Sequence, residues 1–193
     1  MEGLEALLDY LEARGTKPGI SVEERRNIAF LLLEAGRKDR AIKVVTLLAD
    51  GAGPESDDLN QLLYLWGPRP GPAAVNWLSD QAMMTYQGRA QLAKWTEILI
   101  NARTPDIAIQ LAKLEPVTGE LDDLARATIR ALRSLEDRNK LKEYVGFHLD
   151  YATKVSDVLF LATVGFEEGF TEIARNGFER IPVSYTHLTL PTN

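Results

Sequence analysis

The feature that most constrains this sequence is a helical hairpin pattern that returns every 33 or 34 residues. The clearest copy occupies residues 21–54. Its first half, residues 22–35, carries apolar side chains at helical spacing, and Ser21 with Glu24 has the spacing of an N-terminal capping box. Gly36 predicts the end of this helix, and a second apolar stripe follows until a Gly- and Pro-rich stretch. The period is typical of a helix-turn-helix repeat.

One position near the start of each expected second helix sets the phase of the repeat, and we call its residue the anchor. The anchors, spaced 33, 34, 33 and 33 residues apart, are Ala41, Ala74, Ala108, Leu141 and Ala174. Four positions later, one turn along the same face, come Val45, Leu78, Ala112, Val145 and Phe178. Nine positions before the anchors come Leu32, Leu65, Leu99, Leu132 and Gly165. Gly36 and Gly169 both lie five residues before an anchor, where the helix has to turn back. The pattern predicts an all-α chain of five hairpins, at about residues 21–54, 55–88, 89–120, 121–154 and 155–182.

Small residues pair within the first and last hairpins, in the local patterns AGRKDRAI and EEGFTEIA. Over residues 21–182 the chain resembles the tetratricopeptide repeat (TPR) family, in which small residues in the middle of the first helix and the start of the second let the two helices approach closely. Here these residues are Ala29 with Ala41, and Ala162 with Ala174. The central hairpins depart from the pattern at Leu62, Thr96, Ile129 and Leu141. The resemblance implies a right-handed superhelix of stacked helix-turn-helix repeats, a TPR-like α-solenoid.

The two ends of the chain carry separate signals. The pattern of residues 3–14 predicts an amphipathic helix that lies one period before the second helix of the first hairpin. We therefore expect it to be the second helix of an earlier hairpin whose first helix is absent. The alternative is a helix that caps the array. Residues 183–192, VSYTHLTLPT, resemble the one-frame translation of a widely used sequencing adaptor. We therefore expect residues 183–193 to be a non-native, disordered tail and the protein to continue beyond a cut repeat. The alternative is a polar C-terminal extension.

Composition excludes several classes of function. With 45% hydrophobic and 26% charged residues, the chain has a globular balance, and no apolar run reaches the roughly 20 residues that a membrane span needs. We therefore expect no membrane insertion of this fragment. The net charge of −6 argues against a nucleic-acid surface, which carries a concentrated basic field. The absence of cysteine excludes disulfides and thiolate chemistry.

Catalytic and metal-binding patterns are missing from the sequence. Of the two histidines, His187 lies in the expected tail and His148 has no second His or Cys with which to share a metal. No glycine-rich phosphate motif or nucleophile elbow occurs. The adjacent acids of the pair Glu167-Glu168 point to different helix faces, so they cannot flank one reacting bond. We predict that the chain is not an enzyme and holds no cofactor and no metal.

The best candidate for a contact site is a row of three arginines, which we call the arginine stripe: Arg126, Arg130 and Arg133. Their i, i+4, i+7 spacing aligns three guanidinium groups on one helix face. The TPR resemblance places this face on the concave side of the array. The stripe could bind an acidic peptide, a C-terminal carboxylate or an anionic polymer. The alternative is a solvated helix face whose arginines pair with Asp122, Asp123 and Glu136.

The segment LYLWGPRPGPAAVNWL, residues 63–78, resembles repeat regions of bacterial outer-membrane exopolysaccharide-export proteins of the Pel type, in which a periplasmic repeat array precedes a porin. We therefore expect a non-catalytic interaction scaffold that binds a protein or peptide, an anionic partner or a glycan. Its expected location is the periplasm or the outer membrane, with the cytoplasm as an alternative. The competing hypothesis is the helical superhelix of a lytic-transglycosylase-like enzyme whose catalytic domain is missing. The sequence leaves the oligomeric state open.

Overall fold

The computed structural model describes residues 2–182, which form α-helices joined by short turns and loops and contain no strand. The all-α prediction is confirmed. The expected non-native tail, residues 183–193, lies outside the described residues. The helices are α1 (Glu2–Gly15), α2 (Val22–Glu34), α3 (Lys38–Ala49), α4 (Asp57–Trp66), α5 (Pro72–Thr85), α6 (Arg89–Asn101), α7 (Pro105–Ala112), α8 (Asp123–Ser134), α9 (Arg138–Tyr151), α10 (Val155–Glu167) and α11 (Thr171–Glu179).

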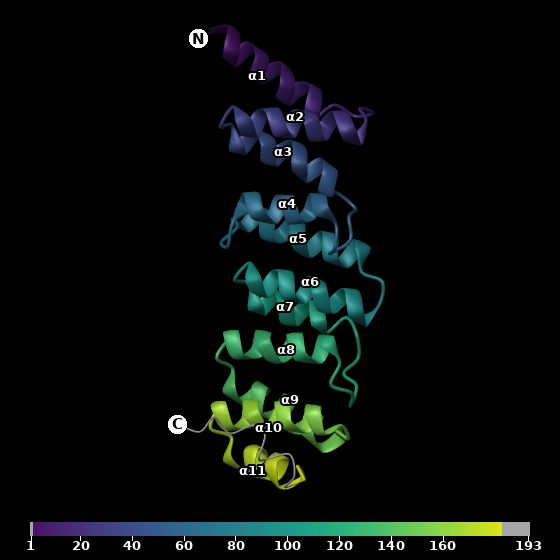
Figure 1. The fold of residues 1–193 in the computed structure, drawn as a ribbon, viewed down its shortest axis with the longest axis vertical. Helices are drawn as coiled ribbons and strands as arrows, with labels where there is room; N and C mark the ends of the chain where they lie inside the picture. Colours follow the sequence, from purple (N-terminus) through teal and green to yellow (C-terminus); the bar gives the residue numbers. More distant parts are fainter. Residues whose placement is uncertain (1, 183–193) are drawn as a thin grey trace. The chain divides into compact units, whose positions relative to one another are not determined.

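The chain divides into two compact units. The first holds α1 to α5 and the short segment Asn101–Thr104; the second holds α6 up to Ile100 and α7 to α11. In the first unit α1 packs on α2 and α3, and α3 packs on both α2 and α4. In the second unit, α7 packs on α8, α8 on α9, α9 on α10 and α10 on α11 (Figure 1). This packing of consecutive helices is compatible with a helical repeat fold.

The repeat phase read from the sequence matches the burial of side chains. The anchors Ala41, Ala108, Leu141 and Ala174 are buried, and Ala74 is half-buried. The leucines nine residues before the first four anchors are all buried. Four residues after the anchors, Val45, Leu78, Ala112 and Val145 are buried, whereas Phe178 is 40% exposed. The predicted periodicity therefore marks the apolar faces on which the helices pack, with Phe178 as the exception.

The turn between two helices of a hairpin has the same backbone shape at several places. Gly36 has φ +71°, and Gly36 N–H and Arg37 N–H donate to the Leu33 and Leu32 carbonyl oxygens at 2.8 Å each, which is a Schellman motif. Gly169 has φ +72° and closes α10 in the same way. Arg103 and Glu136, with φ +63° and +56°, also lie five residues before an anchor. The left-handed position thus recurs even where the residue is not glycine.

Close approach of the paired helices is clearest between α10 and α11. A Cβ atom at Gly177 would lie 2.6 Å from the Cβ of Ala162, and one at Gly165 would lie 3.1 Å from the Ala174 backbone nitrogen. Real Cβ atoms do not tolerate the first distance, so glycine permits this contact. In the first hairpin, Ala29 and Ala41 are fully buried between α2 and α3.

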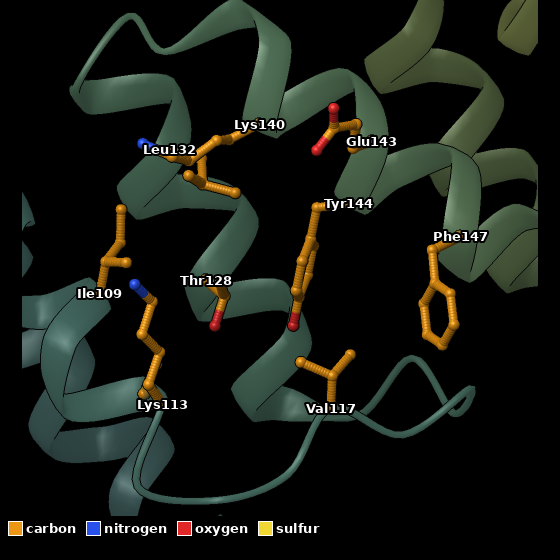
Figure 2. Close-up of a pocket in the computed structure, with 10 residues that line it drawn as sticks. Ile109, Lys113, Val117, Thr128, Leu132, Lys140, Glu143, Tyr144 and Phe147 are labelled. Atoms are coloured by element: carbon orange, nitrogen blue, oxygen red, sulfur yellow. The ribbon is translucent and has the colours of Figure 1, made fainter.

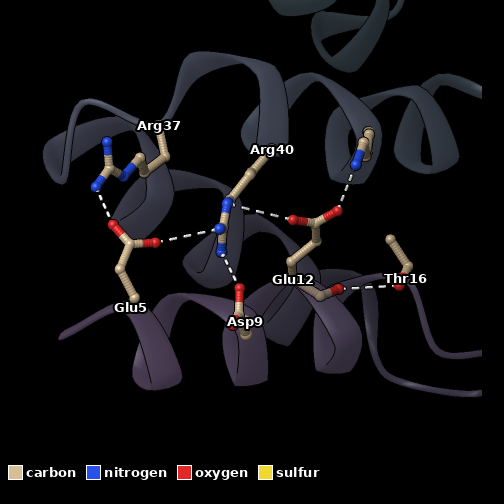
Figure 3. A network of polar contacts seen from close by, with 7 residues as sticks. Glu5, Asp9, Glu12, Thr16, Arg37 and Arg40 are labelled. Atoms are coloured by element: carbon tan, nitrogen blue, oxygen red, sulfur yellow. Dashed lines mark hydrogen bonds and ion pairs between the residues drawn. The ribbon is translucent and has the colours of Figure 1, made fainter. Parts of the chain in front are cut away.

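Helix α1 is tied to the first hairpin by charge. Arg37 pairs with Glu5, Arg40 Nη1 lies 2.7 Å from Asp9 Oδ1, and Lys43 Nζ lies 2.6 Å from Glu12 Oε1 (Figure 3).

The expected capping box of α2 is only half formed. Ser21 Oγ accepts from Glu24 N–H at 3.1 Å, as predicted. The Glu24 carboxylate, however, binds Arg14 through two hydrogen bonds of 2.6 and 3.1 Å instead of reaching back to the cap. Because Arg14 lies at the end of α1, this carboxylate joins two helices.

Candidate partner-binding surfaces

All three residues of the arginine stripe form ion pairs. Arg126 Nη2 lies 2.7 Å from Asp157 Oδ1, and its guanidinium lies 4.5 Å from the centre of the Phe160 ring. Arg130 pairs with Glu97 on α6. Arg133 binds both acids at the end of α10: its Nε lies 2.7 Å from Glu168 Oε1 and its Nη2 lies 3.0 Å from Glu167 Oε2. The stripe therefore joins α8 to α6 and α10, which are the first helices of the hairpins before and after it.

These partners differ from the ones expected for a solvated helix face. Within residues 2–182, no stripe arginine pairs with Asp122, Asp123 or Glu136. Asp122 instead caps α8, where its Oδ1 accepts from Ala125 N–H at 2.9 Å. Its Oδ2 lies 2.6 Å from Arg89 Nε. The expected pairing was wrong because the acidic partners come from neighbouring hairpins and not from the same helix.

The stripe belongs to a wider set of cross-links that span about one repeat. Arg26 on α2 lies 2.8 Å from Asp58 on α4, a separation of 32 residues. Arg126 and Asp157 are 31 residues apart, and Arg89 and Asp122 are 33 apart. Arg26 and Arg126 both lie fifteen residues before their anchors. Equivalent positions in separate hairpins therefore make equivalent ion pairs.

The second candidate surface is a pocket of about 330 Å³ within the second unit, between α7 and α9 and with α8 as its floor (Figure 2). Helix α7 ends four residues after its anchor, whereas α3, α5 and α9 continue for eight or more. Ala112 also occupies the position four residues after the anchor, where the first, second and fourth hairpins carry a buried Val or Leu. A short helix and a small side chain leave this space open. The pocket is lined by Ile109, Ala112, Lys113, Val117, Thr128, Leu132, Lys140, Glu143, Tyr144 and Phe147.

The hydroxyl in the floor of this pocket is already hydrogen-bonded. Thr128 Oγ1 donates to the Leu124 carbonyl oxygen at 2.8 Å. Burial raises the pKa of Tyr144, so its side chain is a neutral phenol at physiological pH. The floor therefore presents an apolar surface.

Three charged side chains stand at the rim of the pocket. Lys140 Nζ is held by Asp137 Oδ2 at 2.6 Å. Lys113 and Glu143 make no ion pair with any residue that the structure describes. Figure 2 shows Lys113 beside Ile109 on the α7 side, and Glu143 on α9 above Tyr144. The pocket thus has a cation and an anion on opposite walls that form no ion pair within residues 2–182, although Glu143 lies near enough to Lys140 to help Asp137 raise the pKa of that amine.

His148 lies buried directly behind the pocket. Its ring centre is 4.7 Å from that of Tyr144 and 5.3 Å from that of Phe147, both of which line the pocket. In the described part of the chain, neither ring nitrogen has a hydrogen-bond partner. Burial lowers the pKa of His148, and the nearby Gly119 backbone offsets this only in part. The ring is therefore neutral at pH 7 and acts as part of an aromatic cluster.

The same residues lack the features of two other kinds of site. Among residues 2–182, no group of three or more acidic or histidine side chains is arranged to hold a metal ion. No helix in that range is long and apolar enough to cross a membrane. No known protein-family model matches the chain, and no curated protein matches it. The TPR and exopolysaccharide-export likenesses therefore remain resemblances in sequence.

Sequence reasoning singled out the arginine stripe as a candidate site but not the pocket. Its walls come from three helices, and no single segment carries a recognisable binding motif. Two local signals point to it in hindsight: Ala112 in place of a larger residue, and Pro116 with Gly119 soon after α7. The proline and glycine favour an early end of α7, and the alanine gives it a smaller side chain at this position.

Proposed function

We propose that this chain is a non-catalytic interaction scaffold, a TPR-like α-solenoid that binds a peptide segment of a partner protein. The observation that carries the proposal is the open, mainly apolar pocket between α7 and α9. At the next pair along the chain the second helices are in direct contact, α9 with α11. An apolar gap in such a row is a natural place for a partner to insert side chains.

In this proposal the arginine stripe holds neighbouring hairpins in register and the pocket is the contact site. An anionic partner at the stripe would have to displace the Asp157, Glu97 and Glu168 carboxylates. The periplasmic export setting rests on residues 63–78 alone and stays a prediction from the sequence, as does the lytic-transglycosylase alternative.

Peptide display tests the proposal. A library of random peptides is selected on the wild-type protein, and the selected peptides are measured against Val117→Asp and Tyr64→Asp. Both residues are exposed, at 56% and 84%, so neither change should unfold the chain. Only Val117 lines the pocket.

We expect the selected peptides to bind Val117→Asp about tenfold more weakly and Tyr64→Asp as tightly as wild type, because a carboxylate at the pocket must be desolvated. Circular dichroism checks that both variants are folded. Failure to select any peptide, or equal binding to wild type and Val117→Asp, would remove the pocket as the contact site.

A further inference from the structure

We infer that the occupant of the pocket is an amphipathic α-helix of a partner protein, bound with its apolar stripe between α7 and α9. One flank of this helix carries an acidic residue toward Lys113, and the other carries a basic residue toward Glu143. The inference rests on the proposed function and adds the conformation and charge pattern of the partner.

Hydrogen bonding favours a helix over an extended peptide. An extended segment brings unpaired N–H and C=O groups into contact with the pocket, and each such group costs free energy unless the site supplies a partner. The Thr128 hydroxyl already donates to the Leu124 carbonyl oxygen at 2.8 Å, and the rest of the pocket floor and walls is mainly apolar. A helix satisfies its own backbone and presents only side chains. The apolar floor therefore suits a helix.

The size and shape of the pocket agree with side-chain insertion. Its volume of about 330 Å³ lies at the lower end of the roughly 300–1,000 Å³ range of ligand pockets, so it takes a few apolar side chains and not a whole domain. Its two walls are helices, α7 with Ile109 and α9 with Tyr144 and Phe147. Insertion of an apolar helix face into a groove between helices is a common mode of peptide recognition.

Charge defines the flanks of the partner helix. Lys113 and Glu143 lie on opposite walls and are not ion-paired within residues 2–182, whereas Lys140 is held by Asp137. Opposite charges on the two walls favour a partner with opposite charges on its two flanks. Because these side chains are at the rim, they contribute more to selectivity and association rate than to affinity.

Three synthetic peptides of about four helical turns test the inference. All share one leucine stripe. Peptide A has glutamate on one flank and lysine on the other, peptide B has lysine on both flanks, and peptide C has glutamate on both. Fluorescence polarisation measures their binding to wild type, Lys113→Glu and Glu143→Lys. A fourth peptide, A with a central proline on its solvent face, keeps the stripe but breaks the helix.

We expect wild type to bind A about fivefold more tightly than B or C, Lys113→Glu to prefer B, and Glu143→Lys to prefer C. The double exchange Lys113→Glu with Glu143→Lys should bind A as wild type does, with the peptide reversed in direction. The proline peptide should bind poorly.

An unchanged ranking in both single variants, or equal binding of the proline peptide, would overturn the inference. If peptide A fails while display-selected peptides still bind in a manner sensitive to Val117→Asp, the helix inference is wrong and the proposed function stands. If neither kind of peptide binds, the proposed function fails too.

Discussion

Replacing Gly36 with alanine isolates the free-energy cost of the left-handed turn that ends α2. Gly36 has φ +71°, and a Cβ atom there would meet nothing within 4 Å, so no steric clash contributes. Holding an L-residue in this conformation costs about 1–2 kcal/mol. Alanine also reduces the freedom of the unfolded chain, which offsets about 0.4–1 kcal/mol. We expect Gly36→Ala to lower the free energy of unfolding by about 1 kcal/mol.

The equivalent position in the fourth hairpin should respond with the opposite sign. Glu136 has φ +56° and is exposed, so it already bears the cost that glycine avoids. Glu136→Gly should relieve this strain and lose about 0.5–1 kcal/mol through greater unfolded-state freedom, for a net gain of about 0.5 kcal/mol. Two residues at one repeat position should therefore move stability in opposite directions.

Urea unfolding followed by circular dichroism measures both effects. A change of 1 kcal/mol shifts the midpoint by roughly 0.3–1 M for ordinary values of the urea slope. Gly53→Ala is the matched control, because Gly53 also has open space around it but no positive φ. The reasoning is refuted if Gly36→Ala is no more harmful than Gly53→Ala, or if Glu136→Gly destabilises the protein.

Three further predictions concern packing, protonation and charge. Gly177→Ala should lower the free energy of unfolding measured in urea by about 1–3 kcal/mol, because the new Cβ atom overlaps Ala162. Combining it with Ala162→Gly should recover part of this loss. No recovery would contradict the close approach of α10 and α11. The pKa of His148 is lowered by burial, so the unfolded chain binds a proton more readily than the folded chain: stability should be full above pH 6.5 and fall below it. His148→Leu should flatten this dependence between about pH 7.5 and 5.5, and an unchanged slope would exclude His148 as its source. Changing the three stripe arginines to glutamine should lower the urea midpoint slightly, because their ion pairs are lost. Changing them to glutamate should lower the midpoint clearly, because the new carboxylates face existing ones. Equal midpoints for wild type and both variants would show that these ion pairs do not stabilise the fold.

Periodicity predicted the helices because burial of an apolar face decides where helices form. Four of the five anchors, and the leucines nine residues before the first four anchors, are buried as the pattern requires, and the turns at Gly36 and Gly169 are where the glycines indicated. The left-handed residues Arg103 and Glu136 carried no such signal. Their backbone follows from the helices on either side and not from their own preference.

The candidate sites were harder to predict because they depend on contacts between hairpins. The arginine stripe was visible as a pattern, but its partners lie about one repeat away in the sequence, on α6 and α10. Local spacing rules consider only residues within a turn or two. The pocket depends on where α7 ends relative to its neighbours, and helix ends are the least reliable part of any reading from sequence.

The proposal that the hairpins stack regularly can be tested directly by distances between spin labels. The chain has no cysteine, so pairs of introduced cysteines label cleanly. The positions two residues after the anchors are exposed in all five hairpins, and Lys43, Asn76, Gln110 and Asn176 serve as label sites. The proposed solenoid predicts that distances from Lys43 to Asn76, Gln110 and Asn176 rise in order, by on the order of 10 Å per hairpin. Distances that fail to rise in chain order, or that place Asn176 as close to Lys43 as Asn76 is, would contradict it.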